Sequence, residues 1–157
     1  MWLSKLAPLL LLAACGYSPA LAPGGSADAL IGQVAVEAPK DANAYDLVRE
    51  LENRLERGQS GAFELDYDIA TDEVAVGVTA EQETTRYSVR GAVTYRLTDP
   101  ATGKSILSGT VQNSTGYSTT ATPVSTRAAQ QDAYERLMVI LADEIVERLI
   151  RSGMFAE

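Results

Sequence analysis

The clearest candidate for chemistry in this 157-residue sequence is the thiol of Cys15, which is its only cysteine. One cysteine cannot form a disulfide within a molecule. Histidine is absent as well, so catalytic triads that use histidine and zinc fingers are excluded. The role of the thiol must therefore follow from its place near the N-terminus.

The residues before Cys15 have the features of an export signal. One positive charge, on Lys5, precedes the uncharged segment 6–14. Nine residues are too few to cross a hydrocarbon core of about 30 Å as a helix, which takes roughly 20. The sequence Leu12-Ala13-Ala14-Cys15-Gly16 resembles the lipobox of bacterial lipoproteins, in which the bond before the cysteine is cut and the cysteine is acylated. The alternative, a buried structural thiol beside an ordinary cleavage site, explains fewer of these features.

We therefore predict a signal peptide at 1–14, a lipidated N-terminus and tether at 15–29, and a single domain at 30–157. Loss of Lys5 with the signal peptide changes the net charge from −8 to −9. A diacylglycerol and an amide-linked acyl chain on Cys15, at about 0.8 kcal/mol per buried CH₂, give stable membrane attachment. Gly16 stands where the sorting rule of enteric bacteria places Asp for inner-membrane retention, so the resemblance favours the outer membrane, facing the periplasm. No cofactor is expected besides this covalent lipid.

Charge and spacing argue against several other functions. With 21 acidic and 13 basic residues, the chain repels nucleic acid, and no such partner is expected. An EF-hand loop starting at Asp66 would need Gly and Glu where the chain has Thr71 and Gly77. We therefore predict no metal site and place a group of four carboxylates on the wet face of a strand: Asp66, Asp68, Asp72 and Glu73. No catalytic residue is assigned and no enzyme is expected, although a carboxylate pair leaves a lipid-anchored hydrolase as an open alternative.

Hydrophobic spacing predicts the elements that hold these residues. Residues 16–29, rich in Gly, Ser, Pro and Ala, form the tether. A short strand is expected at 30–38, followed by a helix from an N-cap at Asn43 to about Arg57, stopped by Gly58. Its apolar stripe follows helical spacing and comprises Leu47, Val48, Leu51 and Leu55.

From residue 62 the apolar period changes to two. Residues 62–80 predict either one interrupted strand or a pair of strands, 85–97 a long strand, 99–103 a turn and 104–118 a return strand. A long helix from an N-cap at Ser125 to Arg151 follows, with Gly153 as its stop. This order predicts an α+β two-layer sandwich with two helices on one face of a mainly antiparallel sheet of about four strands.

Several segments together resemble the LptE family of lipopolysaccharide (LPS) assembly lipoproteins. The start at 15–19 is similar to the C-G-[FY]-x-P start of that family. Further similarity lies at Thr85-Arg86-Tyr87, at 95–99, at Thr102-Gly103-Lys104 and in the long helix at 128–133 and 141–145. The resemblance implies a non-enzymatic outer-membrane lipoprotein that plugs the LPS-translocating β-barrel LptD, helps the barrel assemble and supports LPS insertion at the cell surface.

Three arginines and a polar segment suit such a plug. Arg86, Arg90 and Arg96 share strand parity and predict a basic stripe, whose guanidinium groups fit the phosphates of LPS. The other interpretation pairs them with the neighbouring acidic strand. Residues 113–126, rich in Ser and Thr with Tyr117, predict a hydrogen-bonding tip for a polar barrel lumen, or else a solvated loop.

Another function fits the same lipid anchor and fold. The chain could serve as an auxiliary lipoprotein of a periplasmic lipid transporter or as a secretion pilotin. Co-purification with a large outer-membrane barrel separates the LptE-like role from these alternatives.

Overall fold

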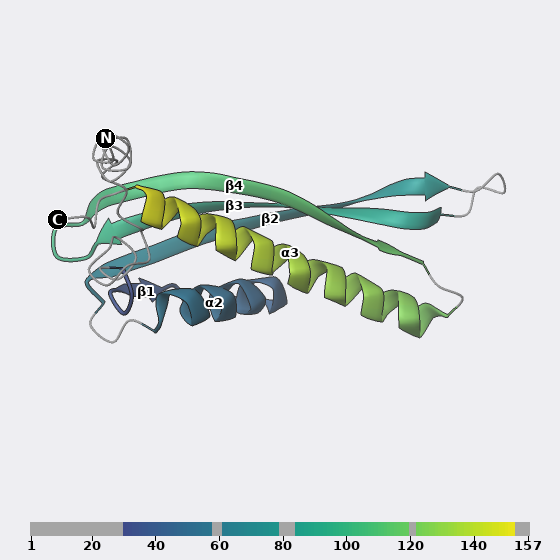
Figure 1. The fold of residues 1–157 in the computed structure, drawn as a ribbon, viewed down its shortest axis with the longest axis horizontal. Coiled ribbons are helices and arrows are strands. Elements are labelled where there is room, and N and C mark those ends of the chain that lie inside the picture. The colour runs from purple at the N-terminus through teal and green to yellow at the C-terminus, as the bar shows by residue number, and fades with distance from the viewer. Residues whose placement is uncertain (1–29, 58–60, 79–83, 120–121, 153–157) are drawn as a thin grey trace, which may run out of the picture.

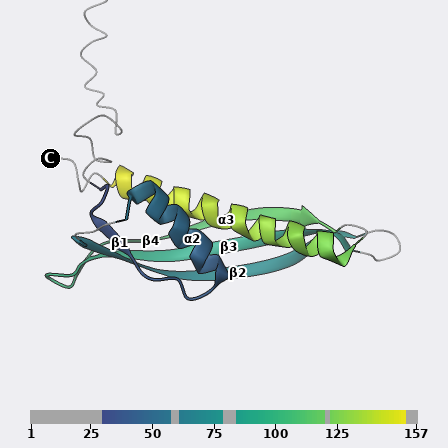
Figure 2. The same cartoon turned by 90° about the horizontal axis from the view of Figure 1, so that it is seen from below.

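The computed structural model describes residues 30–57, 61–78, 84–119 and 122–152, which form a four-stranded sheet with helices on one face (Figures 1 and 2). The prediction of an α+β two-layer sandwich is confirmed. In chain order the described elements are β1 (Val34–Val36), α2 (Ala42–Leu55), β2 (Phe63–Val78), β3 (Thr84–Asp99), β4 (Lys104–Ser118) and α3 (Pro123–Arg151). The strands lie side by side in the order β1-β2-β3-β4.

The sheet is mixed, because β1 runs parallel to β2 while β2, β3 and β4 form an antiparallel meander. Parallel pairing of β1 and β2 needs a crossover connection, and α2 supplies it. The short strand expected at 30–38 is present, although it covers only three residues. Among the described residues, no helix is long and apolar enough to cross a membrane.

Residues 63–78 form one strand of 16 residues, which decides between the two predicted arrangements. Thr71 is opposite Gly91 and Asp72 is opposite Arg90, so pairing with β3 continues without interruption through the middle of β2. The expected turn at 99–103 joins β3 to β4: Asp99 Oδ1 accepts from the N–H of Ala101 at 2.8 Å, and Gly103 adopts φ 67°. Glycine adopts this left-handed conformation without steric cost.

Both helices start earlier than expected. The side chain of Asp41, not Asn43, caps α2 by accepting from the N–H of Ala44 at 2.8 Å. Thr122, not Ser125, caps α3, and Pro123 follows at the first helical position, where its missing N–H leaves no hydrogen bond unmade. In each case the extended backbone ends sooner and a suitable cap residue stands there. The predicted stops, Gly58 and Gly153, lie outside the described residues.

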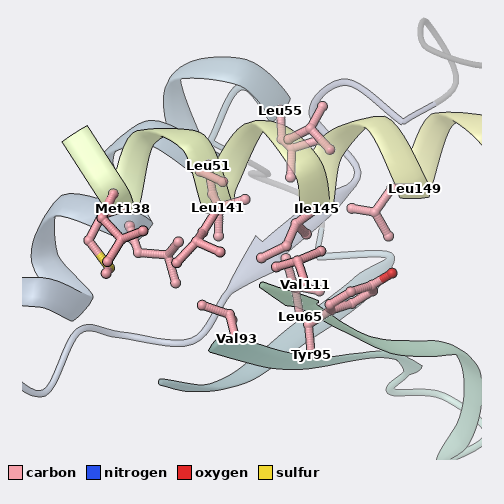
Figure 3. Packing of buried hydrophobic residues seen from close by; sticks show 14 of the residues in the cluster. Leu51, Leu55, Leu65, Val93, Tyr95, Val111, Met138, Leu141, Ile145 and Leu149 are labelled. Atoms are coloured by element: carbon pink, nitrogen blue, oxygen red, sulfur yellow. The ribbon is translucent and has the colours of Figure 1, made fainter. Parts of the chain in front are cut away.

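The core lies between the helices and the sheet (Figure 3). The predicted stripe on α2 is buried, and the inner face of α3 buries eight residues. From the sheet, Leu65, Val93 and Val111 meet them. α3 crosses the long strands obliquely, whereas α2 covers the end near β1 (Figure 1). The two helices are also joined by ion pairs: Arg54 lies 2.6 Å from Asp143 and Arg49 lies 2.7 Å from Glu135.

Gly91 sets how closely α3 approaches the sheet. A Cβ atom on Gly91 would lie 2.9 Å from Cδ2 of Leu137 and 3.0 Å from Cδ1 of Leu141, closer than carbon atoms pack. Because glycine has no Cβ, these two leucines rest directly on the β3 backbone. The long strands are thereby fixed against the helix and present their other side to the surroundings.

Candidate functional site

The face of the sheet opposite the helices, here called the open face, carries most of the polar side chains of the strands. Alternation assigns it, because successive side chains of a strand point to opposite faces. On β3 the odd positions 89–97 are buried, and the even positions 86, 90, 94 and 96 are exposed. On β4 the open face holds Ser108, Thr110, Gln112, Ser114 and Ser118.

Arg86, Arg90 and Arg96 all lie on the open face, on one strand, and all are exposed. At about 3.3 Å per residue they are spaced by roughly 13 Å and roughly 20 Å along β3. The register puts Asp72 opposite Arg90 and Asp66 opposite Arg96, while Arg86 is opposite Gly77. Among the described residues, none of the three arginines makes an ion pair within 4.0 Å.

Each arginine lines a separate shallow hollow of the open face. The hollow at Arg90 includes Asp72 and Gln112, and the hollow at Arg96 includes Asp66, Asp68 and Thr110. The hollow at Arg86 has no carboxylate; its side-chain donors are hydroxyl groups, and it is lined by Val76, Arg86, Tyr87, Ser88, Thr115, Gly116, Tyr117 and Ser118. A guanidinium beside hydroxyl groups, without a competing carboxylate, suits an anionic, oxygen-rich ligand such as a phosphate. Arg86 therefore has the most favourable surroundings of the three.

Glu73 lies on the other side of β2, facing α3, and this corrects its predicted place on the wet face with Asp66, Asp68 and Asp72. Its carboxylate accepts from the hydroxyl of Tyr117 at 2.9 Å and from the side-chain N–H of Gln130 at 2.9 Å, with the Tyr134 hydroxyl 3.5 Å away. The odd position of residue 73 was the sequence signal for this placement. Glu73 thus joins three elements: β2, β4 and α3.

Burial raises the pKa of the Tyr117 phenol well above its ordinary value of 10.0, and the hydrogen bond to the negative Glu73 adds to the shift. Burial first and Glu73 second also raise the pKa of Tyr134. Tyr117 is 8% exposed and its ring stacks on that of Tyr87, with centroids 5.2 Å apart. Both tyrosines therefore stay protonated and neutral, and their hydrogen bonds to Glu73 have a structural role. Among the described residues there is no cluster of three or more metal-ligating side chains.

Comparison with known protein families identifies the family of this chain. The family model LptE, lipopolysaccharide-assembly, matches residues 31–149, which include the described β1, α2, β2, β3 and β4 and nearly all of α3. The chain belongs to the LptE family.

Several solved structures share the fold of this chain. A protein of Caulobacter crescentus CB15 is similar with a TM-score of 0.68 and 26% identity, over 81% of this chain and 93% of that one. The rare lipoprotein B from Shewanella oneidensis has a TM-score of 0.57 at 10% identity, covering 77% of this chain and 94% of its own. A minor lipoprotein from Acinetobacter baumannii has a TM-score of 0.57 at 16% identity, covering 76% and 92%. Among curated proteins, no sequence matches.

The lipidation site and the polar segment 113–126 were both predicted for this LptE-family chain, and the structure describes only the second. Cys15 and the tether at 15–29 lie outside the described residues. The polar segment 113–126 is described except for residues 120–121, and part of it is structural rather than a free tip. Asn113 donates to Glu144 at 2.7 Å and Thr115 to the carbonyl of Ala133 at 2.8 Å, so both face α3. Ser114, Gly116 and Ser118 of this segment lie on the open face, whereas residues 123–126 belong to α3.

Proposed function

We propose that this LptE-family chain is an outer-membrane lipoprotein, anchored through lipid on Cys15 and facing the periplasm. In that place it occupies the lumen of the LPS-translocating β-barrel LptD, helps the barrel to assemble and supports LPS insertion at the cell surface. The observation that carries the proposal is the family match over residues 31–149. The export signal and lipobox before Cys15 support it independently of the fold.

The role proposed is mechanical and non-enzymatic. Barrel interiors are polar, and the open face offers hydroxyl, amide and charged groups over the length of three long strands. Such a face exchanges hydrogen bonds with water for hydrogen bonds with a lumen wall at little net change in free energy. The proposed function then depends on shape complementarity between the open face and the lumen wall, while the lipid on Cys15 holds the chain at the membrane.

We further propose that Arg86, with Arg90 and Arg96, contacts phosphate groups of LPS. Arg86 is the main contact, because its hollow contains no carboxylate and its neighbours include hydroxyl groups of Ser88 and Ser118. Asp72 and Asp66 partly neutralise the other two sites. At roughly 13 Å and 20 Å apart, the arginines meet different phosphates rather than one.

Co-purification tests the main proposal. Lipidated protein extracted from membranes in detergent should bring down a large outer-membrane barrel, and a Cys15→Ser variant should appear in the soluble periplasmic fraction. Recovery only with an inner-membrane transporter would instead assign the chain to lipid-transport auxiliaries, and recovery with a secretion channel would assign it to pilotins. Activity that depends on a carboxylate pair, with the fold intact, would support a hydrolase.

LPS binding by the full-length mature protein tests the stripe. Arg86→Ala should weaken binding, and replacement of all three arginines should weaken it further. Arg127→Ala removes one exposed guanidinium from α3 and is the charge-matched control, for which we expect unchanged binding. Unchanged binding by the triple variant would remove the arginines from the LPS contact.

A further inference from the structure

β4 forms one margin of the sheet, and no described element lies on its outer side (Figure 1). The direction of its backbone groups follows from the register. The N–H of Thr119 donates to the carbonyl of Thr85, which makes Tyr87 and Tyr117 a hydrogen-bonded pair. Odd residues of β4 therefore bond to β3, and the backbone groups of even residues 108–118 point outward.

Edge strands in soluble proteins are usually protected by charge, by proline or by brevity. β4 has none of these: it is 15 residues long, and after Lys104 it contains no charged residue and no proline. Two arginines of α3 cover part of the margin. Arg136 donates to the carbonyl of Gly116 at 3.3 Å and Arg148 to the carbonyl of Thr110 at 2.9 Å.

Between these two covers, a row of backbone groups is available. Within the described residues, the N–H groups of Thr110, Gln112 and Gly116 and the carbonyls of Gln112 and Ser114 make no hydrogen bond. The N–H of Ser114 is satisfied by the side chain of Asn113 at 2.8 Å. A row with a spacing of two residues is what another extended chain would bind.

We propose that the outward margin of β4 binds an extended segment of the barrel partner as a fifth strand. The inference rests on the proposed function for the source of that segment. A closed barrel wall has no free strand edge, so the segment is an inward loop or a terminal stretch of the partner. It carries a carboxylate near Thr110, because Arg148 lies there and makes no ion pair within the described residues.

Charge distinguishes this occupant from a second copy of the chain. Two copies paired through β4 and centred on residue 113 would place Arg148 of one copy beside Arg136 of the other, whose guanidinium is already paired with Asp132 at 2.9 Å, so this contact offers Arg148 no unpaired carboxylate. The exposed carboxylates of Asp66, Asp68 and Asp72 on β2 lie two strands from this margin, about 10 Å away, where salt screens much of their effect on a negative segment. On arrival, N–H groups of the segment replace the guanidiniums at the carbonyls of residues 110 and 116, and this frees Arg148 for the carboxylate.

Amide hydrogen exchange, compared between the free lipoprotein and its detergent-extracted complex, tests the margin directly. The N–H groups of Gln112 and Gly116 should exchange quickly in the free protein and at least about tenfold more slowly in the complex. Those of Val111 and Tyr117 bond to β3 and should be protected in both. Equal exchange of Gln112 and Gly116 in the two states would overturn the proposal.

A proline variant gives a second test. Gln112→Pro removes an outward N–H that the sheet does not use, and Val111 before it is already extended, so the fold should be kept. This variant should recover about fivefold less barrel, the loss expected when one ordinary strand hydrogen bond cannot form. Gln112→Thr, which keeps the N–H, is the matched control. If folded Gln112→Pro recovers as much barrel as the unaltered chain, the proposal that the β4 margin binds a strand is wrong and the proposed function still stands. If the unaltered chain recovers no barrel, the proposed function itself is wrong.

Discussion

Glu73 holds the β2–β3 hairpin against β4 and α3, and replacing it with alanine tests how much that attachment stabilises the fold. The side chain accepts two hydrogen bonds at 2.9 Å, from Tyr117 and Gln130. The Tyr134 hydroxyl, at 3.5 Å, is too far to add much. The two donors differ in what happens to them when the carboxylate is removed.

Gln130 is only half-buried, so its amide can turn to water, but the hydroxyl of the buried Tyr117 cannot do so without opening the core. A buried donor left without a partner costs about 1–3 kcal/mol, and a hydrogen bond to a charged group contributes about 1.5–3 kcal/mol. We therefore expect Glu73→Ala to lower the free energy of unfolding by about 2–3 kcal/mol. For a domain of this size that corresponds to a fall in Tm of roughly 10 °C.

Urea unfolding followed by circular dichroism measures the change. Asp72→Ala, at the neighbouring exposed position on the open face, is the matched control and should stay within about 0.5 kcal/mol of the parent. A double-mutant cycle with Tyr117→Phe should give a coupling of about 1 kcal/mol or more. If Glu73→Ala and its control unfold alike, the attachment does not stabilise the fold and the argument from burial is wrong.

Two further effects follow from the same core. Gly91→Ala places a Cβ about 2.9 Å from Leu137, so we expect a loss of about 1–3 kcal/mol in urea unfolding, and a neutral result would mean that α3 can shift without cost. Because folding raises the pKa of Tyr117 above 10.0, the unfolded state binds fewer protons than the folded state above about pH 10. The free energy of unfolding should therefore decrease as the pH rises above 10, and Tyr117 should add no pH dependence below pH 10. Tyr117→Phe should reduce that alkaline slope, and an unchanged slope would exclude Tyr117 as its source.

Periodicity accounts for the parts of the fold that the sequence predicted. The buried stripes of α2 and α3 repeat at helical spacing, and the alternation of β3 placed Val89 and Arg90 on opposite faces. Cap positions were less predictable, since Asp41 and Asn43 are both good cap residues and only the backbone before them decides. The parallel pairing of β1 depends on contacts distant in sequence, which spacing alone does not encode.

The candidate site shows the same division. Alternation predicts that Arg86, Arg90 and Arg96 lie on one face. Which of these arginines lies opposite a carboxylate depends on the register between β2 and β3, and a slip of one residue would give each arginine a different partner on β2. The prediction for Glu73 is wrong because its position among the exposed Asp66, Asp68 and Asp72 hides the odd parity that turns it toward α3. Its partner Tyr117 is 44 residues away, so no local pattern joins the two.

The position of α3 at the end of the described chain has a consequence for the order of folding. All four strands are complete by Ser118, yet their apolar side is covered largely by residues that follow Pro123. Because the strands are synthesised before α3, the sheet exposes both an apolar face and an uncharged β4 margin until the helix packs against it. Such surfaces are prone to aggregation. The last 29-residue helix therefore closes the face and delivers the two arginines to the margin in a single event. Loss of α3 should make the remaining chain depend on a chaperone.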